Sequence, residues 1–388
     1  MTQKPHESDL LCGPVGQLIQ NQRIIVCCGA GGVGKTTTSA ALALAGARAK
    51  RRVLVLTIDP SKRLAETLGV SQNPPAPVPL SEERLAAARI RPPGHLDAWL
   101  LSPQQVADAA VNRLSSSPEE RARFLQNRIY QQVSQMLAGM HEYTAMEALH
   151  RLLAEGRYDL VILDTPPSRN ALDFLEAPGR LASLLDQRIF RALLPKKGGL
   201  LSRAASKIAQ KGLSAALGEQ FAEEFIAFMA TFSSIFHFLN QDLKEMRAFL
   251  SGPDAAFLLV TSPARASLEE GFYFQSRAQE LRLPFKGFIL NRSSIRADDA
   301  EAEDAARLAR LTMTPELESG LKKLDALAQA ERAQARRDVE VLQELRRRAG
   351  DRGFALSVPD FAHEGSDMEL LIASAQALCG AGQTTSQR

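Results

Sequence analysis

The chain alternates between short, continuous apolar runs and longer segments with helical periodicity. The first run, Arg23–Cys28, is rich in β-branched residues, and a glycine-rich turn and the alanine-rich stretch Thr36–Ala49 follow it, an order that predicts strand, loop and helix. Further apolar runs are Val53–Ile58, Leu160–Leu163, Ala256–Val260 and Phe285–Leu290, with Phe354–Ser357 as a candidate for one more. Strands that are apolar throughout and separated by helices are typical of a parallel sheet covered on both faces. The pattern therefore predicts an α/β fold with a doubly wound, mostly parallel sheet and helices on both faces.

Helical segments interrupt this alternation. After the proline-rich loop Asn73–Pro79, insertions at about 100–153 and 177–250 and a densely charged segment at about 298–348 all have helical character. Apolar residues recur at helical spacing in the second insertion, and they are Phe221, Phe225, Phe228, Met229, Phe232, Ile235, Phe236 and Phe238. We call this set the phenylalanine stripe and leave two interpretations open. Such residues are more often packed core, but they also suit a groove for a hydrophobic partner.

Composition and charge narrow the class of protein. Hydrophobic residues make up 45% of the 388 residues and charged residues 23%, the balance of an ordinary globular protein. The net charge of +3 is small against 47 basic and 44 acidic side chains, so we expect no nucleic-acid partner and at most peripheral membrane contact. No apolar run approaches the roughly 18 to 20 residues of a membrane span, and no signal pattern precedes Arg23. The cysteines Cys12, Cys27, Cys28 and Cys379 lack zinc-site spacing, and a reduced, cytoplasmic setting fits them.

A phosphate-binding motif follows the first predicted strand. The pattern G-x-x-x-x-G-K-[ST] is satisfied by Gly29, Ala30, Gly31, Gly32, Val33, Gly34, Lys35 and Thr36. In such a loop, glycines let main-chain N–H groups close around phosphate oxygens, and the lysine neutralises the β- and γ-phosphates. The Thr36 hydroxyl is a ligand for Mg²⁺, and the helix directs its positive N-terminal end at the anion. The strand before the loop and the helix after it give the motif its required context, so the sequence predicts a P-loop NTPase that binds ATP and Mg²⁺.

Polar residues follow three of the predicted strands. Asp59 ends the second strand and Asp164 directly follows the third, at the sheet edge where ligands of open α/β sheets bind. Asp59 suits the orientation of a water molecule, and Asp164 has the Walker B position near Mg²⁺. The proline-stiffened loop after Asp164 is interpreted as a switch loop that senses the γ-phosphate. Asn291 and Arg292 follow the fifth strand, where the Asn291 amide is able to read a base edge. Each of these residues also has an ordinary interpretation as a loop or strand-end residue.

These features together predict the domain organisation. Residues 1–22 form an N-terminal leader, residues 23–380 a single P-loop ATPase domain that carries an inserted helical subdomain, and residues 381–388 a disordered tail.

The motifs resemble those of the ArsA-type ATPase family, which includes the arsenite-pump ATPase and the ATPase that guides tail-anchored proteins to membranes, and which is related to the MinD and ParA ATPases. The resemblance rests on GAGGVGKTT at Gly29–Thr37, TIDP at Thr57–Pro60, DTPPS at Asp164–Ser168, VTSP at Val260–Pro263 and LNR at Leu290–Arg292. It implies a homodimer or pseudodimer that closes around two nucleotides. It also assigns the attacking water to Asp59, Mg²⁺ to Asp164, and adenine contacts to Asn291 and to Pro359, Asp360 and Phe361.

Two departures from the family pattern affect the mechanism. Members usually carry a second lysine early in the loop, which reaches the partner's phosphates, and here that position is Ala30. We hypothesise that Arg63 or Arg169 supplies the missing cation, because a guanidinium forks onto phosphate oxygens. No cysteine lies between Cys28 and Cys379, so thiolate coordination of a metalloid or of zinc is unsupported, and an arsenite-efflux subunit is the less favoured function.

The leading hypothesis is a Mg-dependent ATPase in which a nucleotide-driven dimer rearrangement binds and releases a protein client with a hydrophobic membrane segment. The alternative from another class is a MinD- or ParA-like positioning switch, which lacks the support of a terminal amphipathic helix here. A P-loop kinase is the third interpretation, and the TIDP and DTPPS loops argue against it.

Overall fold

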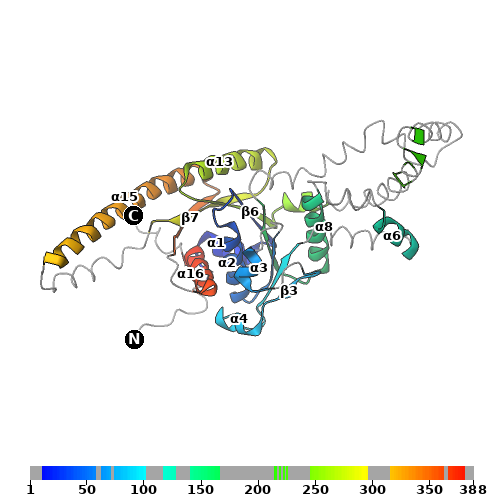
Figure 1. Ribbon diagram of the computed structural model, residues 1–388, viewed down its shortest axis with the longest axis horizontal. Helices are drawn as coiled ribbons and strands as arrows, with labels where there is room; N and C mark the ends of the chain where they lie inside the picture. The colour runs from blue at the N-terminus through cyan, green and yellow to red at the C-terminus, as the bar shows by residue number, and fades with distance from the viewer. Residues whose placement is uncertain are drawn as a thin grey trace.

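One eight-stranded sheet runs through the computed structural model, in the order β3-β4-β2-β5-β1-β6-β7-β8 (Figure 1). Only β3 pairs antiparallel to its neighbour, and the other pairs are parallel, so the predicted doubly wound, mostly parallel sheet is confirmed. The strands are β1 Ile24–Gly29, β2 Arg52–Thr57, β3 Val78–Pro79, β4 His95–Leu100, β5 Leu160–Asp164, β6 Ala255–Thr261, β7 Phe285–Ser293 and β8 Phe354–Pro359. The structure describes residues 11–57, 63–70, 74–101, 117–127, 140–166, 214–215, 218–219, 222, 224–225, 245–295, 315–361 and 366–380.

Helices cover both faces of this sheet, because successive side chains of a buried strand point to opposite sides. In β1, Ile24 and Val26 belong to the core under one face, and Ile25 belongs to the core under the other. The first face packs against α8 (Met140–Glu155), α13 (Arg265–Glu280) and α15 (Pro315–Ala349). The second face packs against α1 (Gly13–Asn21), α2 (Lys35–Arg48), α3 (Arg63–Leu68) and α16 (Asp367–Gly380). The remaining described helices are α4 (Glu82–Ala87) and α6 (Pro118–Leu125).

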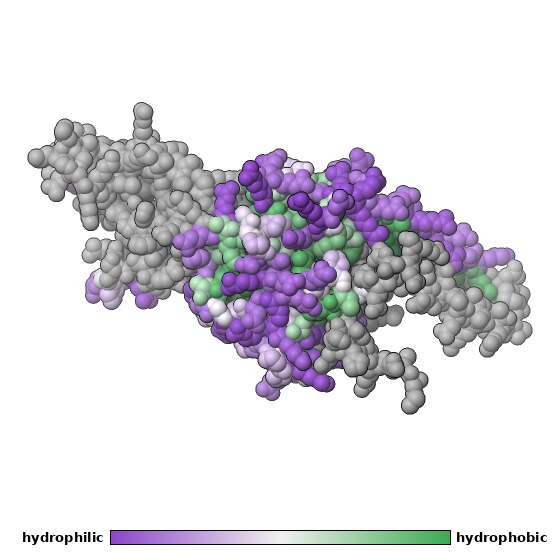
Figure 2. All heavy atoms as spheres, turned by 180° about the vertical axis from the view of Figure 1, so that it is seen from behind, coloured by the Kyte–Doolittle hydropathy of each residue, from purple (hydrophilic) through white to green (hydrophobic). Residues whose placement is uncertain are grey.

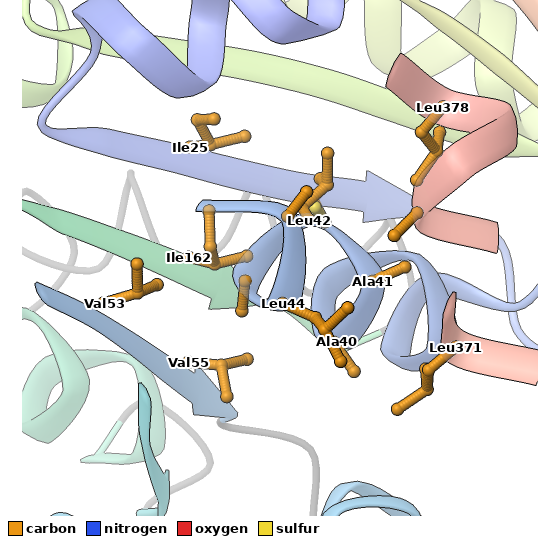
Figure 3. Packing of buried hydrophobic residues seen from close by; sticks show 14 of the residues in the cluster. Ile25, Ala40, Ala41, Leu42, Leu44, Val53, Val55, Ile162, Leu371 and Leu378 are labelled. Atoms are coloured by element: carbon orange, nitrogen blue, oxygen red, sulfur yellow. The ribbon is translucent and has the colours of Figure 1, made fainter. Parts of the chain in front are cut away.

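Helix α2 packs against the sheet and against the neighbouring α16, and it is buried along most of its length (Figure 3). Its alanine-rich sequence brings the helix close to the strands. At Gly46, an added Cβ would stand 3.0 Å from Leu160 Cδ2 and 3.1 Å from Val53 Cγ2. The close packing fixes the first turn of α2, which carries Lys35 and Thr36 of the phosphate loop, against the strand ends. Figure 3 shows the packed residues Ile25, Ala40, Ala41, Leu42, Leu44, Val53, Val55, Ile162, Leu371 and Leu378.

Strands β3 and β4 are absent from the sequence-based expectation. The apolar pattern of β4 is broken by Asp97, which the structure buries completely. Tyr158 donates its hydroxyl to Asp97 Oδ2 at 2.5 Å, and Arg157 Nη2 lies 3.0 Å from the same oxygen. His95 Nε2 lies 2.5 Å from the other oxygen, Oδ1. A carboxylate with these three partners is tolerated inside a sheet, although it interrupts the apolar run that marks a buried strand. The short β3 lies at the end of the proline-rich loop Asn73–Pro79.

The segments outside the sheet differ in how far the structure describes them. Residues expected to form a leader include α1, whose Val15, Leu18 and Ile19 are buried. The charged segment contains α15, a single helix of 35 residues whose N-terminal part projects away from the sheet (Figure 1). Most of the second insertion, including most of the phenylalanine stripe, and the tail 381–388 lie outside the described residues; Phe225 is described, and it packs against the core.

The described surface is mainly hydrophilic in the view of Figure 2, where hydrophobic residues show as small separate areas. The large hydrophobic side chains that the described residues expose are Tyr273, Leu324, Leu327 and Val339. None of the described helices combines the length and the hydropathy that crossing a membrane requires.

Candidate nucleotide-binding site

The phosphate loop connects the end of β1 to the start of α2, and two of its glycines meet specific steric demands. An added Cβ at Gly29 would stand 2.1 Å from the carbonyl oxygen of Val260 on the neighbouring β6. Gly34 has a φ of +91° at the N-cap of α2, and a Cβ there would stand 2.2 Å from Asn291 Nδ2. A side chain at either position would displace the loop, so the glycines are needed for this path of the main chain.

Lys35 lies behind the loop with only 6% of its surface exposed. Its Nζ donates to the carbonyl oxygen of Ala30 at 2.8 Å, and this bond closes the loop on itself. Gly31 and Gly32, by contrast, are exposed. An accessible main chain in front of a buried ammonium group at a helix N-terminus is an arrangement that attracts phosphate.

Asp164 is the acidic centre of the site and is completely buried at the end of β5. Its Oδ2 accepts hydrogen bonds from Thr36 Oγ1 at 2.8 Å and from Thr57 Oγ1 at 3.0 Å. Its Oδ1 accepts a longer bond from Ser39 Oγ at 3.4 Å. The structure therefore brings Thr36 and Asp164 into direct contact.

Thr57 and Ser39 are site residues to which the sequence analysis assigns no role. Thr57 is the last residue of β2 and pairs with Asp164 in the sheet register, so the parallel pairing carries both to one edge. Ser39 lies three residues after Thr36 on the same face of α2. Two features of the sequence point to them. Thr57 is a polar residue at the end of an apolar strand, and Ser39 carries a hydroxyl at helical spacing from Thr36.

Cys27 lies beneath the loop and takes no part in thiolate chemistry. Burial raises the pKa of this thiol to about 12, and the hydrogen bond from Ser39 offsets only part of the effect. The neighbouring Cys28 is buried as well, and burial also raises its pKa. Both groups are neutral thiols near neutral pH, where they act as small apolar side chains of the core.

Asn291 contacts the phosphate loop itself. Its Nδ2 donates to the carbonyl oxygen of Val33 at 2.9 Å. The following Arg292 is exposed and has a φ of +55°, at a shift in register between β7 and β8. Beside it, Pro359 pairs with Ser293, and the Asp360 N–H donates to the Ser293 carbonyl oxygen at 2.9 Å. The structure thus brings both segments expected at the base, 291–292 and 359–361, to adjoining strand ends near the loop.

Several of the remaining predicted residues fall outside the part of the chain that the structure describes. Asp59 and Arg169 lie outside the described residues. Arg63 is the first residue of α3, but its side chain is not among those described. Ala30 is 6% exposed, and it contributes to the core beneath the loop. Thr37 is exposed one residue after Thr36.

The side chains at the loop suit a magnesium nucleotide. Thr36 and Asp164 provide a hydroxyl and a carboxylate, the hard oxygen ligands that Mg²⁺ prefers. Among the described residues, no group of three or more histidine, cysteine, aspartate or glutamate side chains forms a metal cage. Because Mg²⁺ commonly binds through one or two protein oxygens plus phosphates and water, this sparse set fits a metal that arrives with the nucleotide.

Comparison with known proteins agrees with this geometry. The profile of the family described as "Anion-transporting ATPase" matches residues 22–314. The "ATPase get3" of Aspergillus terreus (strain NIH 2624 / FGSC A1156) is 28% identical over 207 residues, which are 50% of this chain and 58% of that protein. The "ATPase ASNA1 homolog" of Leishmania major is 30% identical over 180 residues, 41% of this chain and 44% of that protein. The "ATPase get3" of Schizosaccharomyces pombe is 28% identical over 184 residues, 47% of this chain and 49% of that protein. The chain spans about half the length of the curated relatives it matches.

Proposed function

Because this chain belongs to the anion-transporting ATPase family, the ArsA type, we propose that it hydrolyses ATP in a magnesium-dependent reaction. The observation that carries the proposal is the bond between Thr36 Oγ1 and Asp164 Oδ2 at 2.8 Å, beside the buried Lys35. This arrangement supports the proposal because a hydroxyl and a carboxylate suit Mg²⁺, and a lysine suits the phosphates.

Each residue has a distinct part in the proposed reaction. The main chain of Gly31–Gly34 and the Lys35 ammonium group bind the phosphates, and Thr36 and Asp164 hold Mg²⁺. When bound, Mg²⁺ would neutralise the charge that develops on the phosphate oxygens. Asp59 orients the attacking water, with Mg²⁺ nearby, and Arg63 or Arg169 provides the second cation in place of the lysine absent at Ala30.

The central test is Lys35→Ala. Phosphate release from MgATP should fall at least about a hundredfold, because the variant loses the cation that stabilises the transferred phosphoryl group. The control is Lys322→Ala, which removes the same charge from the exposed part of α15 and should keep the wild-type rate. Calorimetry with ADP and ATP provides a second measurement. Unchanged turnover in Lys35→Ala, or no binding of adenine nucleotide to the wild type, would refute the ATPase assignment.

The second cation is tested by Arg63→Ala and Arg169→Ala, measured separately. Removing a phosphate-contacting arginine typically lowers turnover by about a thousandfold or more. One of the two variants should show such a loss, while its affinity for ADP changes little. Near-normal rates in both would show that another group, or none, supplies the cation.

We also propose that ATP closes a homodimer, which then holds a hydrophobic segment of a protein client, and that this cycle takes place in the cytoplasm. Family membership supports the dimer, the phenylalanine stripe supports an apolar client, and four free cysteines support a reducing compartment. Light scattering should show a mass increase with ATP, and a labelled transmembrane peptide should bind in one nucleotide state only. A monomer in every nucleotide state would contradict the dimer. Equal peptide binding in all nucleotide states would contradict the nucleotide-dependent client binding.

A further inference from the structure

Asp338 is a buried carboxylate on α15 that the proposed reaction does not use. It is completely buried, and its Oδ2 accepts a 2.6 Å hydrogen bond from the main-chain N–H of Ser294. The same oxygen accepts a longer bond from Ser293 Oγ at 3.4 Å, and Oδ1 accepts from Gln334 Nε2 at 3.0 Å. Among the described residues, no ion pair to Asp338 is found. A main-chain amide, a hydroxyl and a side-chain amide therefore hold this charge in place.

The segment that Asp338 holds begins two residues after Asn291. Between them lies the register shift of β7 against β8, where Leu290 pairs with Ser357 but Ser293 pairs with Pro359. This shift inserts one extra residue into β7, and such bulges redirect side chains at strand ends. On one side of the bulge Asn291 is bonded to Val33 of the phosphate loop. On the other side Asp338 bonds the main chain of Ser294.

Ser293 also joins the two segments that we assign to the nucleotide base. Its carbonyl oxygen accepts from the Asp360 N–H at 2.9 Å, in the segment 359–361. Its hydroxyl accepts from the N–H of Ile295 at 3.2 Å. A displacement of Ser293 would thus move the bulge that carries Asn291 and, through the Asp360 bond, the end of β8.

From this geometry, and building on the proposed ATPase, we propose that Asp338 is a positioning residue for recognition of the nucleotide base. It fixes the main chain at Ser293 and Ser294, and this orients both Asn291 and the 359–361 segment relative to the phosphate loop. A hydrogen bond from an N–H to a carboxylate is about twice as strong as one between neutral groups, so the bond to Ser294 is a firm contact. The same contact ties the long helix α15 to the nucleotide site.

The test is Asp338→Asn in the full-length chain, assayed with ATP and with GTP. The wild type should prefer ATP, with a higher kcat/KM for ATP than for GTP. In the variant, the ratio of these two kcat/KM values should fall about tenfold, because the neutral amide holds Ser294 less firmly. The loss should lie mainly in a higher KM for ATP, with kcat within about twofold of the wild type, since the phosphate site is untouched. The matched control is Asp325→Asn on the same helix, where Asp325 also accepts from a glutamine four residues away but is exposed.

A double-mutant cycle separates positioning from general stability. In an Asn291→Ala background, Asp338→Asn should produce little further loss of base discrimination, because the group that it positions is gone. Gln334→Ala provides a second variant, which removes the donor to Oδ1 from a half-buried position together with the exposed bond that Gln334 Oε1 accepts from Arg337 Nη2. It should lower discrimination about threefold.

A wild-type enzyme that turns over ATP and GTP equally would overturn the proposal. So would an unchanged ratio in Asp338→Asn, or in Gln334→Ala if Asp338→Asn does not fold. The ATPase assignment depends separately on Lys35→Ala, so a loss of turnover in that variant with unchanged discrimination in Asp338→Asn removes the positioning role alone.

Discussion

Thr57 Oγ1 donates a 3.0 Å hydrogen bond to Asp164 Oδ2 across the paired ends of β2 and β5. The same oxygen accepts from Thr36 Oγ1 at 2.8 Å, so one carboxylate oxygen is held from the phosphate loop and from the neighbouring strand. Thr36 is a proposed metal ligand, whereas Thr57 has no other assigned task. We infer that Thr57 keeps Asp164 oriented when Thr36 binds the metal.

Thr57→Val should therefore raise the Mg²⁺ concentration needed for half-maximal ATPase activity about three- to tenfold. Loss of a hydrogen bond that orients a metal ligand typically lowers metal affinity by about tenfold or more. The expected effect is smaller here because Ser39 still bonds Asp164 through Oδ1. Valine keeps the β-branched shape that suits a buried strand end, so the fold should persist. Magnesium titrations of phosphate release measure the effect. Thr261→Val is the control, because Thr261 is an equally buried threonine that ends β6. An unchanged magnesium requirement in Thr57→Val would contradict this role.

Gly34→Ala should abolish detectable binding of ADP. The new Cβ would stand 2.2 Å from Asn291 Nδ2 at a φ of +91°, so both the loop and the Asn291–Val33 bond must shift. Gly156→Ala is the matched control, since Gly156 has a φ of +63° with no atom within 4 Å of the added carbon. That control should cost about 1 kcal/mol of unfolding free energy from backbone strain and leave nucleotide binding intact. Calorimetry with ADP compares the two, and retained binding in Gly34→Ala would argue against the loop geometry.

The strands made of an uninterrupted run of apolar residues were predictable from sequence, and β4 was not. Runs such as Val53–Ile58 contain only residues that a two-sided buried strand accepts, so their pattern identifies them. In β4, Asp97 interrupts the run, and two of its partners, Arg157 and Tyr158, lie about sixty positions away in the chain. Only the folded sheet brings these groups together, so the local hydrophobic pattern of β4 does not show that Asp97 can be buried there.

The same distinction applies to the candidate site. Lys35 and Thr36 belong to a local motif with fixed spacing, and their positions follow from it. Asn291 was assigned to a base from its place after a strand, yet the structure shows its amide on the Val33 carbonyl, 258 positions away. The contacts of Asp338 also depend on the register of β7 against α15, which no local sequence pattern specifies.

Tyr158→Phe should lower the free energy of unfolding by about 1.5 to 3 kcal/mol, because it removes a hydrogen bond to the buried Asp97 carboxylate. Burial, followed by the hydrogen bond to Asp97, raises the pKa of Tyr158, so the phenol remains a donor at neutral pH. Urea unfolding provides the measurement. The control is Asp159→Asn, which breaks the ion pair to Arg52, whose side chain is 50% exposed, and which should cost less than about 1 kcal/mol. If the two variants lose the same unfolding free energy, the bond between Tyr158 and Asp97 does not stabilise the sheet more than an exposed ion pair does.

Cys379→Ala should reduce the alkaline loss of stability. Burial raises the pKa of the Cys379 thiol from 9.0 to about 12, and Arg48, which favours the thiolate, offsets only part of this. Above about pH 9 the unfolded chain releases the proton that the folded chain keeps, so unfolding becomes easier as pH rises, by up to about 1.4 kcal/mol per pH unit for each such thiol. Alanine cannot titrate, so in urea unfolding between about pH 8 and pH 10.5 the stability of the variant should fall less steeply with pH, by the contribution of one thiol.

Leu378→Ala separates packing from titration, because it opens a cavity on the same helix and should lower stability by a similar amount at every pH. If Cys379→Ala keeps the wild-type slope, the thiol ionises in the folded protein as readily as in the unfolded chain, and it does not experience the burial that the packing of α16 against α2 imposes.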